Sequence, residues 1–553
     1  MTATRPATRY TVEQMRRYAT DGPWPGLTVD QMFRRVVDRR GDALAVIDDR
    51  RSLSYGELDL WADRIAAALL DMGLEGGDRV ALQLPNSAEF CAVYFGCQRA
   101  GVVPVGFPVH FRHKEVGYIL DRAGARAYVG PTTWQGFDYR DMLDRVRPPA
   151  LVGYLANGDE PPSGAVDLGR VLAEGRRPAA DEVARHAPSP DDVAQILVTS
   201  GTEADPKMPM WIHNAMPGMG TIGDAAGMGE GDRNLVLVPA CSGFGMGVGP
   251  FLTQAWRGAT LVVRERFTPA DALATIERER VDIVCGVGAQ LIAMLEAPTF
   301  DGHDYESLRT VVSFGGPVAQ RVIGDIQDRM SCSFVSGYGM SEVPCVISIT
   351  RPGDDPAVVA KSVGRPFPEW ISIRIVDPDN QDVPPGDEGE ILLDGPGVGG
   401  GYFGAPELNR AWDDDGWLHT GDLGRLDPTG NLTITGRKKD VILRGGMNIS
   451  PREVEEAIFA HPAVANVAVV AMPDHRLGER ACAFVVLRAG RQLGLDELVR
   501  FLRDERRLSV YKLPERLEIV DELPLNPAGK VKKFVLRQMV AAQQIREQTQ
   551  EVG

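Results

Sequence analysis

Short apolar runs alternate with helix-like segments along most of this chain of 553 residues. Residues 80–84, 102–105, 196–198 and 283–285 are examples. Each run has the length of a buried strand, and polar or helical sequence follows it. This alternation predicts parallel α/β layers. From about residue 371 the pattern changes to short strands separated by Pro and Gly turns, which predicts a β-rich lobe.

Composition and charge exclude several classes of protein. The net charge of −16 argues against sequence-independent nucleic-acid binding, because such binding requires a basic face. Seven scattered cysteines match neither a zinc ribbon nor a disulfide framework, so we expect reduced, buried thiols in a cytoplasmic protein. Residues 235–256 are uncharged and long enough to span a bilayer, but their prolines and glycines favour a strand, a turn and a packed helix. We therefore expect neither nucleic-acid nor membrane partners.

The loop of residues 199–207, with the sequence TSGTEADPK, follows a predicted strand. Glycine lets backbone N–H groups approach phosphate oxygens, hydroxyls donate hydrogen bonds, and lysine supplies a positive charge. The spacing of glycine and lysine differs from that of the Walker loop. A polar surface turn explains the loop equally well when it is considered alone. Its interpretation therefore depends on later stretches.

Five later stretches complete a set of six motifs. They are residues 313–317 (SFGGP), 337–342 (GYGMSE), 416–424 (GWLHTGDLG), 436–440 (GRKKD) and 524–530 (PLNPAGK). In this order and at this spacing, the chain resembles the adenylate-forming superfamily of acyl- and aryl-CoA ligases, adenylation domains and luciferases. The N-terminal arm and residues 136–140 most resemble the stand-alone aryl-acid adenylating enzymes.

The resemblance implies an α/β fold with two unequal domains. A large multi-lobed N-terminal domain, residues 1–437, would combine two parallel α/β layers with the β-rich lobe. Residues 438–439 would form a hinge, with Lys439 at the position that absorbs the backbone change. Residues 440–553 would form a small mobile α+β lid that carries the catalytic lysine. Gly445 and Gly446 would line the tunnel for the thiol.

The resemblance also implies a reaction and roles for residues. A carboxylate would attack the α-phosphate of ATP to give an acyl adenylate and pyrophosphate, and a thiol of CoA or of a carrier protein's phosphopantetheine would then release AMP. Lys530, Glu342 and Lys207 would be catalytic, with Glu342 as the Mg²⁺ ligand and Thr202 as a weaker second one. The ATP-binding residues would be Thr199, Ser200, Gly201, Thr202, Gly315, Gly316, Pro317, Tyr338, Gly339, Met340, Ser341, Asp422 and Arg437.

The expected acid pocket departs from the family pattern. It would contain Ser242, Gly243, Phe244, Val248, Gly337 and Cys345. Many relatives have His at the position of Ser242, and enzymes that recognise 2-hydroxybenzoates usually have Asn at that of Gly243. Gly243 and Gly337 are expected to leave space, which suits a flat aromatic acid other than simple salicylate.

Two other functions remain open on the sequence. Some relatives of aryl-acid ligases activate nitrite and couple it to an aromatic amine, and the altered residues Ser242 and Gly243 motivate this diazotase-like alternative. A degenerate, non-catalytic nucleotide-binding protein is the second, although the intact charged residues argue against it. The identity of the acid, the choice between CoA, carrier protein and amine as acceptor, and the oligomeric state, including a homodimer, stay open.

Overall fold

The computed structural model describes residues 8–199, 206–316, 318–525 and 531–551. Its N-terminal part contains a seven-stranded sheet in the order β11-β10-β4-β3-β5-β8-β9, parallel except for the antiparallel edge strand β11. The strands are β3 (Arg79–Leu82), β4 (Val103–Gly106), β5 (Ala127–Pro131), β8 (Gly153–Asn157), β9 (Val166–Asp167), β10 (Val193–Leu197) and β11 (Met210–Ile212). The central strands are buried, which explains their continuous apolar sequences.

A second, eight-stranded sheet has the order β17-β16-β15-β14-β12-β13-β1-β2 and is parallel from β16 to β1. Its strands are β1 (Leu44–Ile47), β2 (Ser52–Ser54), β12 (Arg233–Val236), β13 (Thr260–Val263), β14 (Ile283–Gly286), β15 (Thr310–Ser313), β16 (Ser333–Tyr338) and β17 (Ser348–Ile349). Because β1 pairs with β13, the first fifty residues contribute a strand as well as the helical arm that the sequence predicts.

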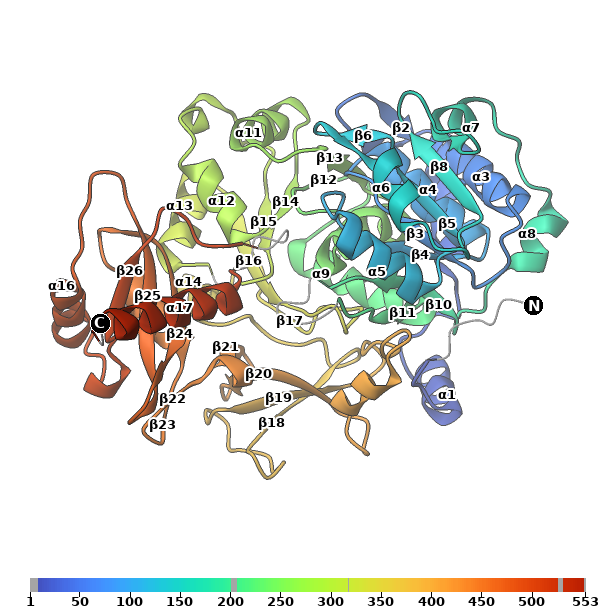
Figure 1. Ribbon diagram of the computed structural model, residues 1–553. Helices are drawn as coiled ribbons and strands as arrows, with labels where there is room; N and C mark the ends of the chain where they lie inside the picture. The colour runs from blue at the N-terminus through green and yellow to red at the C-terminus, as the bar shows by residue number, and fades with distance from the viewer. Residues whose placement is uncertain (1–7, 200–205, 317, 526–530, 552–553) are drawn as a thin grey trace.

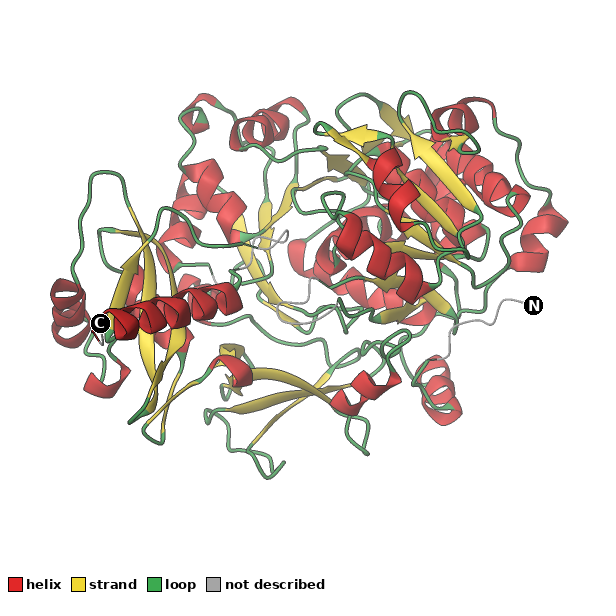
Figure 2. Cartoon of the chain, in the orientation of Figure 1, coloured by secondary structure: helices red, strands yellow, loops and turns green. Residues whose placement is uncertain are grey.

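Helices separate and cover the two sheets (Figures 1 and 2). Every residue of α4 (Ala88–Arg99) is buried, and one apolar cluster joins side chains of β3 with side chains of β12 and β13. The other helices of this part are α1 (Val12–Thr20), α2 (Val29–Arg40), α3 (Tyr55–Asp71), α5 (His113–Ala123), α6 (Tyr139–Val146), α7 (Leu168–Glu174), α8 (Ala180–His186), α9 (Gly220–Ala226), α10 (Gly243–Met246), α11 (Pro269–Arg278), α12 (Gly288–Leu295), α13 (Gln320–Met330) and α14 (Pro356–Lys361). Thr11 and Gln14 form the predicted capping box of α1.

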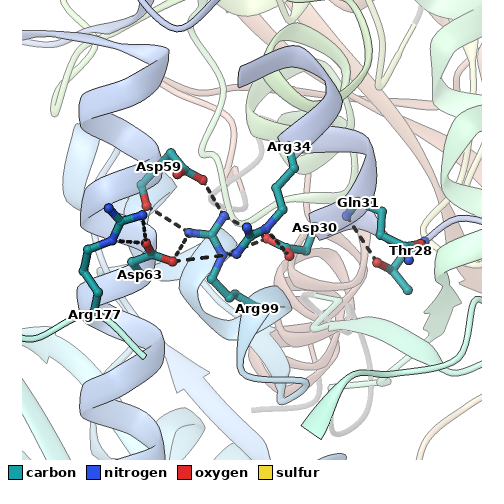
Figure 3. A network of polar contacts seen from close by, with 8 residues as sticks. All are labelled: Thr28, Asp30, Gln31, Arg34, Asp59, Asp63, Arg99 and Arg177. Carbon is teal, nitrogen blue, oxygen red and sulfur yellow. Dashed lines mark hydrogen bonds and ion pairs between the residues drawn. The ribbon is translucent and has the colours of Figure 1, made fainter. Parts of the chain in front are cut away.

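A buried ionic network holds the first helices together (Figure 3). The guanidinium of Arg99 on α4 is fully buried and lies 3.0 Å from Asp30, 2.6 Å from Asp59 and 2.7 Å from Asp63. Burial lowers the pKa of Arg99, but the three carboxylates outweigh it and the pKa is raised. The cation therefore stays charged, and it joins α4 to α2 and α3. Removing one partner of such a buried set typically costs about 3–5 kcal/mol of stability.

The remaining elements form the predicted β-rich lobe and a smaller α+β unit (Figure 1). The lobe is an antiparallel sheet of β18 (Ser372–Val376), β19 (Gly389–Asp394), β20 (Leu418–Leu426) and β21 (Leu432–Arg437). The unit contains β22 (Ile442–Arg444), β23 (Met447–Ile449), β24 (Val464–Asp474), β25 (Gly478–Leu487), β26 (Arg516–Ile519), α15 (Pro451–Phe459), α16 (Leu495–Arg500) and α17 (Lys533–Glu551). It has apolar clusters of its own.

Two predictions from composition can be checked directly. All seven cysteines are buried and unpaired, as expected. Residues 235–256 form the end of β12, a turn, α10 and a buried helical segment, Gly247–Trp256, with a break at Gly249. Within the described ranges, no helix combines the length and apolar character that crossing a bilayer requires.

Candidate functional site

The two ends of the predicted phosphate loop meet just beyond β10. The backbone N–H of Thr199 donates to the carbonyl of Lys207 at 3.0 Å, and the N–H of Lys207 donates to the Thr199 hydroxyl at 3.3 Å. The loop residues Ser200, Gly201 and Thr202 lie outside the described residues. These hydrogen bonds place the Thr199 side chain next to the backbone of Lys207, so the two predicted residues are neighbours in space.

Glu342 and Lys207 meet at a third side chain, Tyr402. The Tyr402 hydroxyl donates to Glu342 Oε1 at 2.7 Å, and both side chains are buried. Lys207 Nζ lies 5.3 Å from the centre of the Tyr402 ring. Burial and then the charge of Glu342 raise the pKa of Tyr402, so its hydroxyl remains a donor. The structure thus joins two predicted residues through one that sequence reasoning missed.

A second polar cluster joins β16 to the β-rich lobe. Tyr338 at the end of β16 donates its hydroxyl to Asp422 Oδ2 at 2.5 Å, and Arg437 Nε lies 3.0 Å from Asp422 Oδ1. Asp422 and Arg437 face each other across the β20–β21 pair. Burial and then Asp422 raise the pKa of Tyr338. The predicted stacking, ribose and nucleotide residues therefore form one hydrogen-bonded set.

The glycine turn follows β15, which pairs with β16, and residues 339–341 directly follow Tyr338. Gly315 has φ of +94°, in the left-handed region that favours glycine. A side chain at Gly316 would meet open space, while Pro317 lies outside the described residues. Gly339, Met340 and Ser341 continue from Tyr338, and the carbonyl of Ser341 accepts a hydrogen bond from Trp211 Nε1 at 2.8 Å.

Ser242 is committed to its own helix. Its hydroxyl donates to the carbonyl of Pro239 at 2.7 Å and accepts from the N–H of Gly245 at 3.0 Å, which makes it the N-cap of α10. A Cβ at Gly243 would lie 3.3 Å from Leu197 and 3.7 Å from the Ser341 hydroxyl. Gly243 therefore lies beside the predicted nucleotide residues, in surroundings with little room for a side chain.

Phe314 occupies the space expected at Gly337. A Cβ at Gly337 would overlap the Phe314 ring, so Gly337 does not leave an open space, contrary to the expectation. The ring centres of Phe314 and Phe244 lie 4.7 Å apart, with a tilt of 35° between the planes. Phe314 belongs to the glycine-turn motif, but the sequence analysis did not name it among the expected pocket residues.

Two other predicted pocket residues lie deeper than expected. Val248 is fully buried, and its carbonyl accepts a hydrogen bond from Asn234 at 2.8 Å. Cys345 belongs to an apolar cluster with Tyr10 and Trp370, which is separate from the cluster that Phe244 joins. Its side chain lies against Gly397, and its cluster also includes Tyr338 and Met340, so the assignment of Cys345 to the pocket wall stays a prediction.

The predicted hinge and thiol-tunnel residues lie in short turns. Lys439 lies in a single turn, Lys438–Asp440, between β21 and β22. Gly445 and Gly446 connect β22 to β23, both with positive φ, and the N–H of Gly445 donates to the carbonyl of Leu477 at 2.7 Å. Lys530 lies outside the described residues, and the flanking residues Leu525 and Val531 pair as an antiparallel bridge.

The described residues contain no group of three or more potential metal-ligating side chains. Glu342 is a buried carboxylate, and one of its oxygens accepts the hydrogen bond from Tyr402. A lone carboxylate that acts together with substrate phosphates is a common way to hold Mg²⁺. The donor set is thus compatible with Mg²⁺ bound with a nucleotide.

Comparison with known proteins identifies the family. The sequence profile of AMP-binding enzymes matches residues 33–403, and that of their C-terminal domain matches residues 453–530. The chain belongs to the AMP-binding enzyme family. It is 35% identical to a salicylyl-CoA synthase / salicylate adenylyltransferase of a Streptomyces species, over 95% of this chain and 96% of the relative. It is 33% identical to the medium-chain fatty-acid–CoA ligase of Escherichia coli, over 98% and 95% of the two chains.

A solved structure gives the same result for this AMP-binding enzyme. The crystal structure of an anthranilate CoA ligase with anthranoyl-AMP superposes with a TM-score of 0.86 at 25% identity, covering 94% of this chain and 98% of the other. The family and fold predicted from the six motifs are confirmed. The chain is an ATP-dependent ligase of the acid–thiol type, which forms an adenylate and then a thioester with CoA or a carrier protein.

Proposed function

We propose that this ligase activates an aromatic carboxylic acid. The observation that carries the proposal is the tilted ring pair of Phe244 and Phe314. In the sequence, Phe314 directly precedes Gly315 and Gly316, which are proposed to bind the nucleotide. Offset or tilted rings provide flat apolar walls that suit another ring. Relatives that act on salicylate and anthranilate support the same substrate class. Because Ser242 is used as a cap, the acid is selected mainly by shape.

The polar clusters are proposed to hold Mg²⁺ and ATP. Glu342 would bind Mg²⁺ through the oxygen that Tyr402 leaves available, with Thr202 as a weaker ligand, and Lys207 would contact the outer phosphates. Tyr338 would stack on adenine while Asp422 accepts the ribose hydroxyls, since each carboxylate oxygen has a second lone pair. Mg²⁺ would supply positive charge that offsets the charge of the phosphates.

Positioning and charge stabilisation are proposed to drive adenylation. The acid carboxylate would attack the α-phosphorus in line, the bond to the bridging oxygen would break, and pyrophosphate would leave with that electron pair. Lys530 would lie between the carboxylate and the α-phosphate and stabilise the developing charge. In the second step a thiol would attack the acyl carbon and AMP would leave.

The second step is proposed to use a rotated lid. Residues 1–437 would form the stationary domain, Lys439 the hinge within 438–439, and residues 440–553 the lid. Gly445 and Gly446 would then line the path of the pantetheine arm, because their backbone permits close approach. Carrier-protein loading, a homodimer and a cytoplasmic location complete the proposal and are open to direct test.

The test is ATP–pyrophosphate exchange and AMP release with a panel of acids. Monocyclic and bicyclic aromatic acids should support exchange, while medium-chain fatty acids should not, and CoA should convert exchange into net AMP release. Exchange with fatty acids alone would contradict the aromatic assignment. AMP release that requires both nitrite and an aminoarene would favour the diazotase-like alternative instead.

Lys530→Ala tests the proposed catalytic lysine. Loss of one donor to the transition state should lower the exchange rate by about 10²–10³-fold. Lys532→Ala, which removes a lysine two positions away, should leave exchange within about twofold of wild type, because the half-buried Lys532 is not one of the proposed site residues. Full turnover by the Lys530→Ala enzyme would overturn the proposed role.

A further inference from the structure

Residues 399–403 connect two parts of the proposed nucleotide site. The N–H of Gly399 donates to the carbonyl of Glu342 at 2.9 Å, and a Cβ at Gly399 would overlap that carbonyl. The N–H of Phe403 donates to the carbonyl of Met208 at 2.8 Å, one residue beyond Lys207. One short segment therefore fixes the backbone next to the carboxylate and the backbone next to the lysine.

The N-terminal arm supports this segment from the other side. Arg9 Nε donates to the carbonyl of Gly399 at 2.9 Å, and the N–H of Arg9 donates to the carbonyl of Gly400 at 3.0 Å. The centre of the Trp412 ring lies 4.7 Å from the Arg9 guanidinium and 5.7 Å from the centre of the Tyr402 ring. The Tyr402 ring is consequently held by contacts on several sides.

The Tyr402 side chain makes one contact to Glu342 and one contact to Lys207. Its hydroxyl fixes Oε1 of Glu342, and its ring lies under the Lys207 ammonium. Hydrogen bonds to a ligating carboxylate orient it, and the face of an aromatic ring attracts a cation. The hydroxyl and the ring thus offer two separable effects within one residue.

We infer that Tyr402 is a positioning residue that orients the Mg²⁺-binding carboxylate of Glu342 through its hydroxyl and the phosphate-binding Lys207 through its ring. The inference rests on the proposed function, since it assigns Mg²⁺ to Glu342 and phosphate to Lys207. In this assignment Tyr402 acts on ATP and Mg²⁺ only through Glu342 and Lys207. Tyr402 positions the Glu342 carboxylate and the Lys207 ammonium before ATP binds.

Titration calorimetry with ATP, in Mg²⁺ and in EDTA, measures the two effects separately. Tyr402→Phe removes only the hydroxyl, so it should reduce the advantage of Mg²⁺ over EDTA by roughly 10-fold or more. Its affinity for ATP in EDTA should stay within about twofold of wild type, because the ring under Lys207 remains. Tyr402→Leu should reduce the Mg²⁺ advantage equally and also weaken ATP binding in EDTA by about threefold or more.

Tyr305→Phe is the matched control. The Tyr305 hydroxyl is also buried and donates to a carbonyl, that of Phe300, at 2.6 Å in a different apolar cluster. Its loss should lower the melting temperature without changing either ATP affinity. In a Glu342→Gln background, Tyr402→Phe should change the Mg²⁺ advantage by less than about twofold, because the two groups act on one metal site.

The outcomes separate this inference from the proposed function. Wild-type enzyme without Mg²⁺-dependent ATP binding would refute the Mg²⁺ assignment itself, whatever the variants do. If wild type binds as proposed, an unchanged Mg²⁺ advantage in Tyr402→Phe would overturn the inference. Equal losses in Mg²⁺ and in EDTA would overturn it too, since they would indicate a general structural role.

Discussion

The proposed nucleotide side and the proposed acid side of the site are built in opposite ways. On the nucleotide side, Tyr338, Asp422 and Arg437 come from different strands and satisfy one another through hydrogen bonds of 2.5 and 3.0 Å. On the proposed acid side, Phe244 and Phe314 form a tilted ring pair, and the hydroxyl of Ser242, two residues before Phe244, caps α10.

This difference indicates how each substrate is discriminated. A site with buried hydrogen-bonding groups rejects a ligand that leaves them unpaired, by factors of about 10⁴–10⁵. An apolar pocket separates ligands that differ by one carbon by only about 10–200-fold. We therefore expect strict selection of the nucleotide and graded selection among aromatic acids, with shape as the main criterion.

Among the variants that test this difference between the two sides, Asp422→Ala should have the largest effect on activity. It leaves Tyr338 and Arg437 without their shared acceptor, which for a fully buried pair would cost about 3–5 kcal/mol. Because the Arg437 side chain is 49% exposed, water reduces this cost in stability. The variant also lacks the proposed charged acceptor of the ribose hydroxyls, and losing such a hydrogen bond, at about 1.5–3 kcal/mol, should lower kcat/KM for ATP roughly 10–150-fold. The KM for the aromatic acid should change little. Steady-state kinetics with each substrate varied in turn measures both.

Asp427→Ala is the control in the same hairpin. The exposed Asp427 carboxylate accepts from the N–H groups of Thr429 and Asn431 in the β20–β21 turn and lies outside the Tyr338–Asp422 cluster. Its removal should lower stability and leave the KM for ATP unchanged. If Asp422→Ala weakened the acid and ATP equally, the two sides would not be independent and the comparison would fail.

Phe314→Ala should have the next largest effect, on acid selection. Removing the ring opens the space beside Gly337 and should shift kcat/KM about 10-fold toward bicyclic aromatic acids over monocyclic ones. The lost packing should lower the free energy of unfolding by about 3–4 kcal/mol. Exchange assays with paired acids and denaturant titrations check the two results.

Phe300→Ala separates selectivity from stability. Phe300 and Phe314 are both buried, but Phe300 belongs to the apolar cluster of Tyr305 and the ring pair belongs to a different cluster. It should cost similar stability and leave the ratio between bicyclic and monocyclic acids unchanged. An unaltered ratio in Phe314→Ala would mean that Phe314 does not border the acid.

Local sequence patterns were sufficient for much of the fold. Apolar runs such as residues 196–198 and 283–285 predicted buried strands because strands of parallel sheets are covered on both faces. The change to short strands and Pro/Gly turns near residue 371 predicted the β-rich lobe, and the six motifs indicated the family. These features are encoded within a few neighbouring residues.

Contacts between distant segments could not be predicted in the same way. Tyr402 meets Glu342 only because residues 399–403 pair with the segment after Lys207, and periodicity carries no information on such pairing. Phe314 fills the space of Gly337 because β15 and β16 are neighbours in the sheet. The run of glycines before Tyr402 was the available signal, since glycine marks close backbone approach. The roles of Lys530, Lys439, Gly445 and Gly446 remain predictions.

Ser242→Ala should have the smallest effect and bears most directly on the acid side. Loss of an N-cap costs about 1 kcal/mol of stability, and Ser242→Asn should restore most of it because Asn caps equally well. If the hydroxyl serves only α10, the preference between 2-hydroxybenzoate and benzoate should change less than about twofold in Ser242→Ala. A selective loss of 2-hydroxybenzoate would reveal a polar anchor on the acid side. Pyrophosphate exchange with both acids distinguishes the two results, and Ser54→Ala, which uncaps α3, supplies the stability control.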